Sequence, residues 1–311
     1  MRSSKIAGCV CFLLVLFFSA HWSLRAQTQN LAERLGYPAD AKLLIIHADD
    51  LGLAHSVDQA SFAALDQKAV TSASIMVPCP WFSEVASYAQ AHPEADLGLH
   101  LTLTSEWKTY RWGPLASKDQ VRGLLDPMGY LWPDVPPVVK NASPEEVERE
   151  IRAQVDEAIR AGVKPTHLDS HMGTLFANPA FFAAYVKVAH EYGVPFFAPR
   201  VPNAPKEILA LGEKTGFLLD GFAMAGDQLK PEGWQAFYAS VLRSLQPGVT
   251  ELIVHLGHDD AELQAIAVDH PAYGSAWRQR DFDVMTSPAF KKALEENHVV
   301  LIGWSDLKKL L

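Results

Sequence analysis

The stretch KLLIIHADDLG, Lys42 to Gly52, joins a buried strand to a charged end. Its aliphatic run predicts a strand that is buried on both faces, and this strand leads into a histidine and two adjacent carboxylates, Asp49 and Asp50. One explanation is structural: Asp50 or Ser56 could cap the following helix by accepting hydrogen bonds from its first amides. The other explanation is functional, with the two carboxylates forming part of a site at the strand's end.

Similar strand candidates recur along the chain, and helices with clear boundary signals lie between them. The strand candidates cover residues 42–48, 71–77, 96–103, 166–172, 195–199, 251–257 and 298–304. In the clearest helix, Ser143 and Glu146 form a capping box and Gly162 ends the helix. Its buried stripe is expected to contain Val147, Ile151, Val155 and Ile159. The segments 178–193 and 287–297 repeat this design.

Strands that alternate with helices, without hairpin signals between them, predict a parallel sheet. At least seven such units predict a closed (β/α) barrel, and an open doubly wound sheet is the alternative. No linker divides the chain, so residues 27–311 are expected to form a single α/β domain. The segment 104–141, rich in Trp, Pro and Gly, is the one long insertion. Loops of that length are usually functional.

The N-terminal segment 1–26 has the features of a secretory signal peptide. Arg2 and Lys5 precede the apolar run from Ile6 to Phe18, and Ala26 offers a cleavage point. An uncleaved anchor is the alternative, although a run of 13 residues is short for a spanning helix. We therefore expect an exported protein, periplasmic or secreted, with no stable membrane insertion after cleavage.

Charge and cysteine content narrow the expected partners. The chain has a formal net charge of −9, and loss of the signal leaves 24 basic and 36 acidic residues. Such a surface repels phosphate backbones, so nucleic acid is not expected as a partner. Cys79 is the only cysteine after the signal, which excludes an internal disulfide. The domain must therefore be stabilised by its core.

Polar residues stand at several predicted strand ends, which converge on one mouth in a parallel barrel. They are Asp49, Asp50, His100, His167, Asp169, His171, Arg200 and His255. A lone histidine in an apolar strand is more often a hydrogen-bonded core residue than a ligand. Together, however, these carboxylates and imidazoles would be costly to bury without a metal or a reaction. The set is typical of a catalytic divalent metal with open coordination positions.

The adjacent carboxylates are expected to have different roles. Successive side chains on an extended strand point to opposite sides. One of Asp49 and Asp50 could therefore bind the metal while its neighbour faces a water molecule as a general base.

These residues resemble the YdjC/ChbG-type carbohydrate deacetylases, a polysaccharide deacetylase-like family. The resemblance rests on HADDLG at 47–52, LGLHLTLTSEW at 97–107, THLDSHMG at 166–173, PRVP at 199–202, and HLGHDDAEL at 255–263 followed by RQRDFDVMTSP. The motifs occur in the family's order and span nearly all of the chain after the signal. The resemblance implies a distorted TIM-like barrel that removes acetyl groups from N-acetylated sugars with a divalent cation, Mg²⁺ or Zn²⁺.

The resemblance also implies roles for individual residues. It places the metal ligands at Asp50, His100 and His171, the general base at Asp49, and the acid, a protonated imidazole that donates to the leaving amine, at His255. Arg200 is expected to orient Asp49 or to bind substrate. Asp169 is expected to hold the second nitrogen of a ligand histidine.

Two positions depart from the family's pattern. Many relatives carry another histidine after the DSH motif, where this chain has Met172 and Gly173, so His167 stays an alternative to His171 as ligand. Many relatives also have proline directly after the histidine that corresponds to His255, where this chain has Leu256. The loop after His255 is therefore expected to differ from theirs.

The substrate implied by the resemblance is an acetylated carbohydrate. Four aromatic residues of the insertion offer flat faces for sugar rings, with packing onto the barrel as an equal alternative: Trp107, Tyr110, Trp112 and Trp132. A metal-dependent phosphoesterase and a secreted sugar-binding protein are the competing functions. A phosphoesterase needs positive charge around the phosphate, and Arg200 is the only evident cation among the strand-end residues. A sugar-binding protein without catalysis would not need both Asp49 and His255. The deacetylase is therefore favoured.

Overall fold

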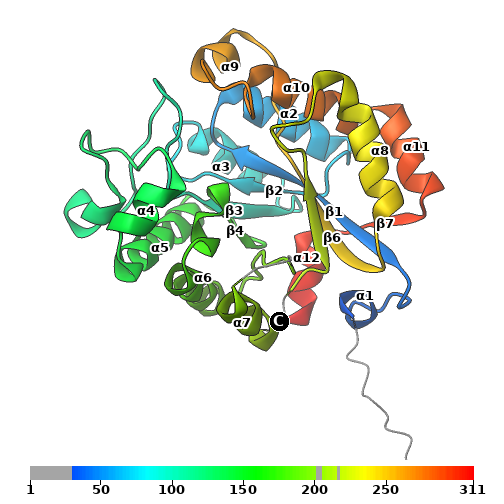
Figure 1. Ribbon diagram of the computed structural model, residues 1–311, viewed down its shortest axis with the longest axis horizontal. Helices are drawn as coiled ribbons and strands as arrows, with labels where there is room; N and C mark the ends of the chain where they lie inside the picture. The colour runs from blue at the N-terminus through cyan, green and yellow to red at the C-terminus, as the bar shows by residue number, and fades with distance from the viewer. Residues whose placement is uncertain (1–29, 201–204, 216–217) are drawn as a thin grey trace, which may run out of the picture.

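The computed structural model describes residues 30–200, 205–215 and 218–311 (Figure 1). The predicted signal segment, 1–26, lies outside the described residues. Within the described ranges, no helix is both long and apolar enough to span a membrane.

Seven parallel strands form the centre of the domain, which confirms the predicted parallel α/β sheet. They are β1 (Lys42–Leu51), β2 (Ser72–Ile75), β3 (Leu97–Leu101), β4 (Leu168–Ser170), β5 (Gly221–Met224), β6 (Gly248–Val254) and β7 (Val299–Leu301). Their order is β4-β3-β2-β1-β6-β5, and β7 pairs with the first residues of β1. β1 is buried along nearly all of its length, as its aliphatic run predicts, and it has strand partners on both edges.

The sheet curls into a distorted barrel with an irregular seam. Leu168 of β4 bridges to Phe196, and Pro199 bridges to Leu219, shortly before β5. The predicted strand at 195–199 is thus reduced to isolated bridges, which continue the ring from β4 toward β5. β5 itself gives no clear signal in the sequence, because GFAM is short and begins with glycine. The observed fold is the expected single-domain, distorted (β/α) barrel.

Helices surround the strands on the outside of the barrel (Figure 1). The α-helices are α1 (Leu31–Arg34), α2 (His55–Asp66), α3 (Phe82–Ala91), α4 (Val135–Asn141), α5 (Pro144–Arg160), α6 (Pro179–Tyr192), α7 (Lys206–Thr215), α8 (Trp234–Ser244), α9 (Ala261–Ile266), α10 (Ser275–Met285), α11 (Pro288–Glu296) and α12 (Trp304–Leu307). Short 3-10 helices are η1 (Lys118–Gln120), η2 (Arg122–Leu124), η3 (His171–Phe176), η4 (Pro231–Gly233) and η5 (Lys308–Leu310).

α5 begins as its capping signals predict. The Ser143 hydroxyl accepts a hydrogen bond from the amide of Glu146 (3.2 Å), and the Glu146 carboxylate accepts one from the amide of Ser143 (2.8 Å). These contacts satisfy two amides at the start of the helix. The predicted buried stripe is confirmed except at Ile159, which is exposed in the last turn.

The insertion at 104–141 packs onto the barrel as a folded layer that contains η1, η2 and α4. Thr104 bridges to Trp132, which ties the two sides of the insertion together. The Trp112 indole is buried and donates to the carbonyl of Thr104 (2.8 Å). The Trp132 indole donates to the carbonyl of Gly123 (2.9 Å). These two tryptophans therefore hold the insertion together.

Candidate metal and catalytic centre

The end of β1 carries a bulge that turns two carboxylates into one cavity. Asp50 has a φ of 73°, a left-handed conformation that Asp tolerates better than most residues, and the pairing register with β2 shifts between Ala48 and Leu51. The expectation that Asp49 and Asp50 point to opposite sides of an extended strand is therefore wrong. Both line a cavity of about 850 Å³ at the carboxyl ends of the strands.

Helix capping does not explain these carboxylates. α2 begins after Ala54, which supplies no side-chain cap. Ser56, the other candidate, donates its hydroxyl to Asp260 (2.7 Å) and Glu262 (2.6 Å) instead. The structural explanation for the acidic end of β1 is thus wrong, and the functional explanation stands.

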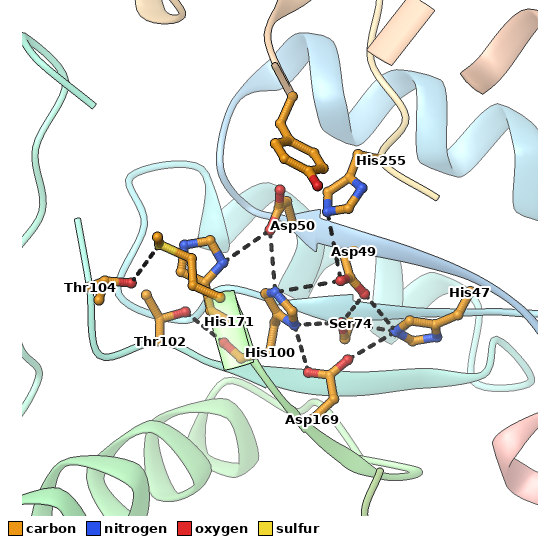
Figure 2. Close-up of polar contacts among 12 residues, drawn as sticks. His47, Asp49, Asp50, Ser74, His100, Thr102, Thr104, Asp169, His171 and His255 are labelled. Carbon is orange, nitrogen blue, oxygen red and sulfur yellow. Dashed lines mark hydrogen bonds and ion pairs between the residues drawn. The ribbon is translucent and has the colours of Figure 1, made fainter. Parts of the chain in front are cut away.

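Asp50, His100 and His171 converge on the cavity from β1, β3 and the start of η3 (Figure 2). Asp50 Oδ1 lies 3.4 Å from His100 Nε2 and 3.4 Å from His171 Nδ1. One donor atom from each residue lies within 4.8 Å of the other two. Asp50 Oδ1 is buried and has no hydrogen-bond partner. A buried carboxylate oxygen without a partner is costly unless a cation satisfies it.

This set of donors fits a divalent cation. One carboxylate and two imidazoles are the ligands of catalytic metals that keep positions open for water and substrate. The described residues contain two further clusters with donor atoms close enough for a metal, and both include Asp169. The Asp169 oxygens are already hydrogen-bonded, one to His100 Nδ1 (2.7 Å) and one to His47 Nε2 (3.0 Å). We therefore place the candidate metal at Asp50, His100 and His171.

Asp169 contacts the second nitrogen of His100, as expected, and extends the site to His47. His47 Nε2 also lies 3.2 Å from Asp49 Oδ1. Burial opposes a charge on His47, but the carboxylates of Glu251, Asp169 and Asp49 outweigh it and raise its pKa well above the usual value. A protonated His47 places a positive charge beside the Asp49 carboxylate.

Glu106 is a site residue that is not among the polar residues expected at the strand ends. Its Oε2 lies 3.1 Å from His171 Nε2, so it orients this histidine. Burial alone would lower the pKa of His171, but Glu106 and Asp50 together raise it to about 10. Glu106 lies beyond the end of β3 in the stretch LTLTSEW, and its carboxylate reaches His171 because β3 and β4 are neighbours.

His255 follows β6 and faces Asp49, with 3.8 Å between its Nε2 and Asp49 Oδ2. Its backbone amide donates to Asp281 (3.0 Å), and its ring packs edge-on against Tyr273. Burial lowers the pKa of His255 to about 4, in spite of the nearby Asp50 and Asp49. The imidazole is therefore neutral at pH 7, and His255 must gain a proton before it can act as the acid.

The structure brings the guanidinium of Arg278, from α10, to the site and does not bring Arg200 there. The Arg200 side chain is exposed and pairs with Glu213 (3.0 Å). Arg278 Nη2 donates to Asp50 Oδ2 (2.6 Å), and its Nη1 is buried without a partner. Burial would raise the pKa of Asp50, but Arg278 and the neighbouring imidazoles hold it well below the usual value. Arg278 lies on a helix, so a search for polar residues at the predicted strand ends does not find it.

His167, the alternative metal ligand, lies in the barrel interior. Its ring is fully buried and stacks on Trp304 with 4.7 Å between centroids. Gly98 provides the space, since a Cβ at that position would clash with the imidazole. Burial lowers the pKa of His167 well below the usual value, so the ring is neutral. Of the two histidines, the structure brings His171 to Asp50.

One of the four aromatic residues expected to face sugar, Trp107, lines the cavity. The centroid of its ring lies 5.8 Å from Cζ of the Arg278 guanidinium. Tyr110 lies outside the lining and donates its hydroxyl to the carbonyl of Leu53 (2.7 Å). Packing of the insertion therefore accounts for Tyr110 and the two other tryptophans.

Fold and site together define a single-domain (β/α) barrel with a buried carboxylate and imidazole centre suited to a divalent cation. The family profile described as YdjC-like protein matches residues 43–296. The chain therefore belongs to the YdjC-like family, which confirms the resemblance found in its sequence.

Several relatives match over nearly their whole length. A carbohydrate deacetylase from Thermus thermophilus is 32% identical over 299 residues, covering 91% of this chain and 99% of that protein. A chitooligosaccharide deacetylase from Yersinia enterocolitica is 25% identical, covering 85% and 99%. A crystal structure from Enterococcus faecalis, titled a putative cellobiose-phosphate cleavage protein, is 26% identical with a TM-score of 0.72, covering 86% and 99%.

Proposed function

We propose that this protein is a metal-dependent hydrolase that removes acetyl groups from N-acetylated sugars. The observation that carries the proposal is the buried Asp50 Oδ1, which has no hydrogen bond and lies 3.4 Å from one nitrogen each of His100 and His171, in the same cavity as Asp49 and His255. Together these residues supply a metal site, a base and a proton carrier, which suits amide hydrolysis. Relatives named carbohydrate deacetylase and chitooligosaccharide deacetylase support the same activity.

The donors favour Zn²⁺ over Mg²⁺ as the divalent cation at Asp50, His100 and His171. Imidazole nitrogen suits zinc, whereas magnesium prefers oxygen ligands and keeps several waters. When bound, the ion polarises the acetyl carbonyl and lowers the pKa of the attacking water. Arg278 keeps Asp50 ionised, and Glu106 and Asp169 orient the two histidines.

Asp49 is the proposed general base, and His255 is the proposed proton carrier. Asp49 takes a proton from the attacking water and passes it to His255, which is neutral beforehand. His255 then donates this proton to the amine nitrogen as the C–N bond breaks and acetate leaves. The 3.8 Å between Asp49 Oδ2 and His255 Nε2 exceeds a hydrogen bond, so the transfer needs a small approach of the two side chains.

Acetate release from N-acetylated mono- and oligosaccharides tests the proposal. Zinc-loaded protein should release acetate, exhaustive chelation should abolish the release, and added Zn²⁺ should restore it. Full activity after chelation would remove the metal from the mechanism. Metal-loaded protein that releases no acetate from any of these sugars would overturn the deacetylase.

The phosphoesterase is the second candidate, because Arg278 supplies a cation at the site and the Enterococcus relative is titled a putative cellobiose-phosphate cleavage protein. Arg278 is already paired with Asp50, however, and the carboxylates of Asp49 and Glu106 also line the cavity. This negative surrounding disfavours a phosphate. Phosphate release from a sugar phosphate is therefore the control assay, and a rate above that of acetate release would favour the phosphoesterase.

We also propose that residues 1–26 direct export and are then removed, as their charge and apolar run suggest. N-terminal sequencing of protein recovered from the periplasm or the medium tests this. A mature chain that begins near residue 27 supports export, and an intact N-terminus in the cytoplasmic fraction contradicts it.

A further inference from the structure

The cavity at the candidate metal site has two chemically different sides. The polar side contains the carboxylates and histidines described above. Every described lining residue between positions 197 and 253 is apolar, including Phe197, Ile208, Phe222, Met224 and Ile253. These five residues, called the apolar wall below, come from the seam, α7, β5 and β6. Polar and apolar sides thus meet within one continuous cavity.

Part of the apolar wall lies open to water. Phe222 is 41% exposed and Met224 is 37% exposed, although both line the cavity. Burying such surface is favourable, so large apolar side chains left open in a cavity mark a place where an apolar ligand group binds. The rings of Phe197 and Phe222 meet edge to face, with 6.0 Å between centroids. They therefore pack against each other and do not form one flat platform.

A second sugar unit is a poor match for this wall. Sugar hydroxyls removed from water need hydrogen-bond partners, and the side chains of the apolar wall offer none. Stacking of sugar rings suits Tyr and Trp, which combine an aromatic face with a polar edge. Ile208, Met224 and Ile253 have neither feature.

We propose that the apolar wall binds a hydrocarbon chain attached to the acetylated sugar, so that the substrate is amphiphilic. This inference rests on the proposed deacetylase function, which places the acetamide at the polar side. Because both sides belong to one cavity, the group joined to the sugar then extends along the apolar wall. A cavity of about 850 Å³ is in the range that holds a ligand of that kind.

Methyl, butyl and octyl glycosides of N-acetylglucosamine, used below their micelle concentrations, test the inference. The value of kcat/KM for acetate release should increase about fourfold per added methylene until the wall is filled. Chitobiose and chitotriose should show no comparable gain over the monosaccharide. A gain with sugar units, together with no dependence on alkyl length, would overturn the inference and leave the deacetylase in place.

A matched pair of variants locates the effect. Met224→Gln replaces a side chain of the apolar wall by a polar one of similar shape, and it should lower the ratio of octyl to methyl kcat/KM about tenfold. Met128→Gln makes the same change at a residue that is 78% exposed and does not line the cavity, so it should leave the ratio unchanged. An unaltered ratio in Met224→Gln would contradict the assignment of the wall.

Calorimetric titration of metal-free protein with the same glycosides separates the inference from the proposed function. Affinity that increases with chain length, with no acetate released by the metal-loaded protein, would support the apolar wall and reject the deacetylase. Affinity that does not change with chain length would reject the apolar wall, whatever the activity.

Discussion

Asp49 and Asp50 are adjacent in the chain, yet their surroundings differ. Asp49 lies beside His47 and His255, whereas Asp50 lies between the two ligand histidines. We expect Asp49→Asn to keep the metal and to lower kcat by at least about two orders of magnitude, because only the general base is lost. The His171→Gln variant should instead bind much less metal, because it lacks one of the three proposed ligands. Metal content and acetate release of both purified variants are the measurements.

His171→Gln is the cleaner ligand variant because it leaves the ion pair between Asp50 and Arg278 intact. Changing Asp50 would strand a buried guanidinium and destabilise the protein as well. Thermal unfolding of each variant controls for folding. Metal-free Asp49→Asn alongside fully loaded His171→Gln would contradict the assigned roles.

Metal binding should depend on pH because a ligand histidine must lose its proton. The neighbouring carboxylates raise the pKa of His171 to about 10 in the absence of metal, so this ring carries a proton at neutral pH. The pKa of His100 is raised as well, because Asp169 and Asp49 outweigh its burial. Affinity should therefore increase at least about tenfold per pH unit toward pH 10. Competition titrations over a pH series measure this. Binding without proton release, judged from calorimetry in buffers of different ionisation enthalpy, would contradict it.

Replacement of His255 should affect amides far more than activated esters. His255→Ala removes the proton carrier, so kcat for an N-acetylated sugar should decrease by roughly two to four orders of magnitude. A nitrophenyl acetate has a leaving group that departs without protonation and should lose much less. Equal losses on both substrates would show that His255 acts on the carbonyl or holds the site together. The metal content should stay unchanged, since His255 is outside the ligand set.

Two glycines in the strands have opposite tolerances, which gives a matched test of the packing beneath the site. A Cβ at Gly98 of β3 would clash with the buried ring of His167, so Gly98→Ala should lower the free energy of unfolding by about 1–3 kcal/mol. At Gly221 of β5 the same atom would lie 3.5 Å from Thr250 Oγ1, an ordinary contact. Gly221→Ala should be neutral or slightly stabilising.

Denaturant unfolding of the two alanine variants decides this prediction. Equal stability of Gly98→Ala and the unaltered protein would show that His167 moves aside at little cost. A loss in Gly221→Ala of the size expected for Gly98→Ala would point to a general need for glycine in these strands.

The sequence predicts elements well where local signals are strong. The aliphatic run of β1 and the capping box of Ser143 and Glu146 both appear where the pattern places them. The seam is harder to predict, because 195–199 forms only bridges and β5 is too short to show a pattern. Such segments take an extended form through their neighbours in the ring, which local sequence does not record.

Across the whole molecule, predictability follows the barrel's geometry. Asp49, Asp50, His100, His171 and His255 meet because the carboxyl ends of parallel strands share one mouth, and this rule works from sequence. Arg278 and Glu106 come from a helix and an insertion, whose docking depends on packing across the fold. The bulge that holds Asp50 in a left-handed conformation likewise cannot be predicted from the residues around it.

The barrel's hydrogen bonding is uneven around its circumference. β1 and β6 pair at seven consecutive positions, whereas the seam depends on single bridges at Phe196 and Pro199. Opening the ring at the seam breaks few hydrogen bonds, so its amides should exchange for deuterium much faster than those of β1. Exchange followed by mass spectrometry should show fast labelling of the amides of Phe197 and Leu219. A ligand that fills the adjoining cavity should slow this labelling. The exchange rate of the seam amides would then show in solution whether the cavity is occupied.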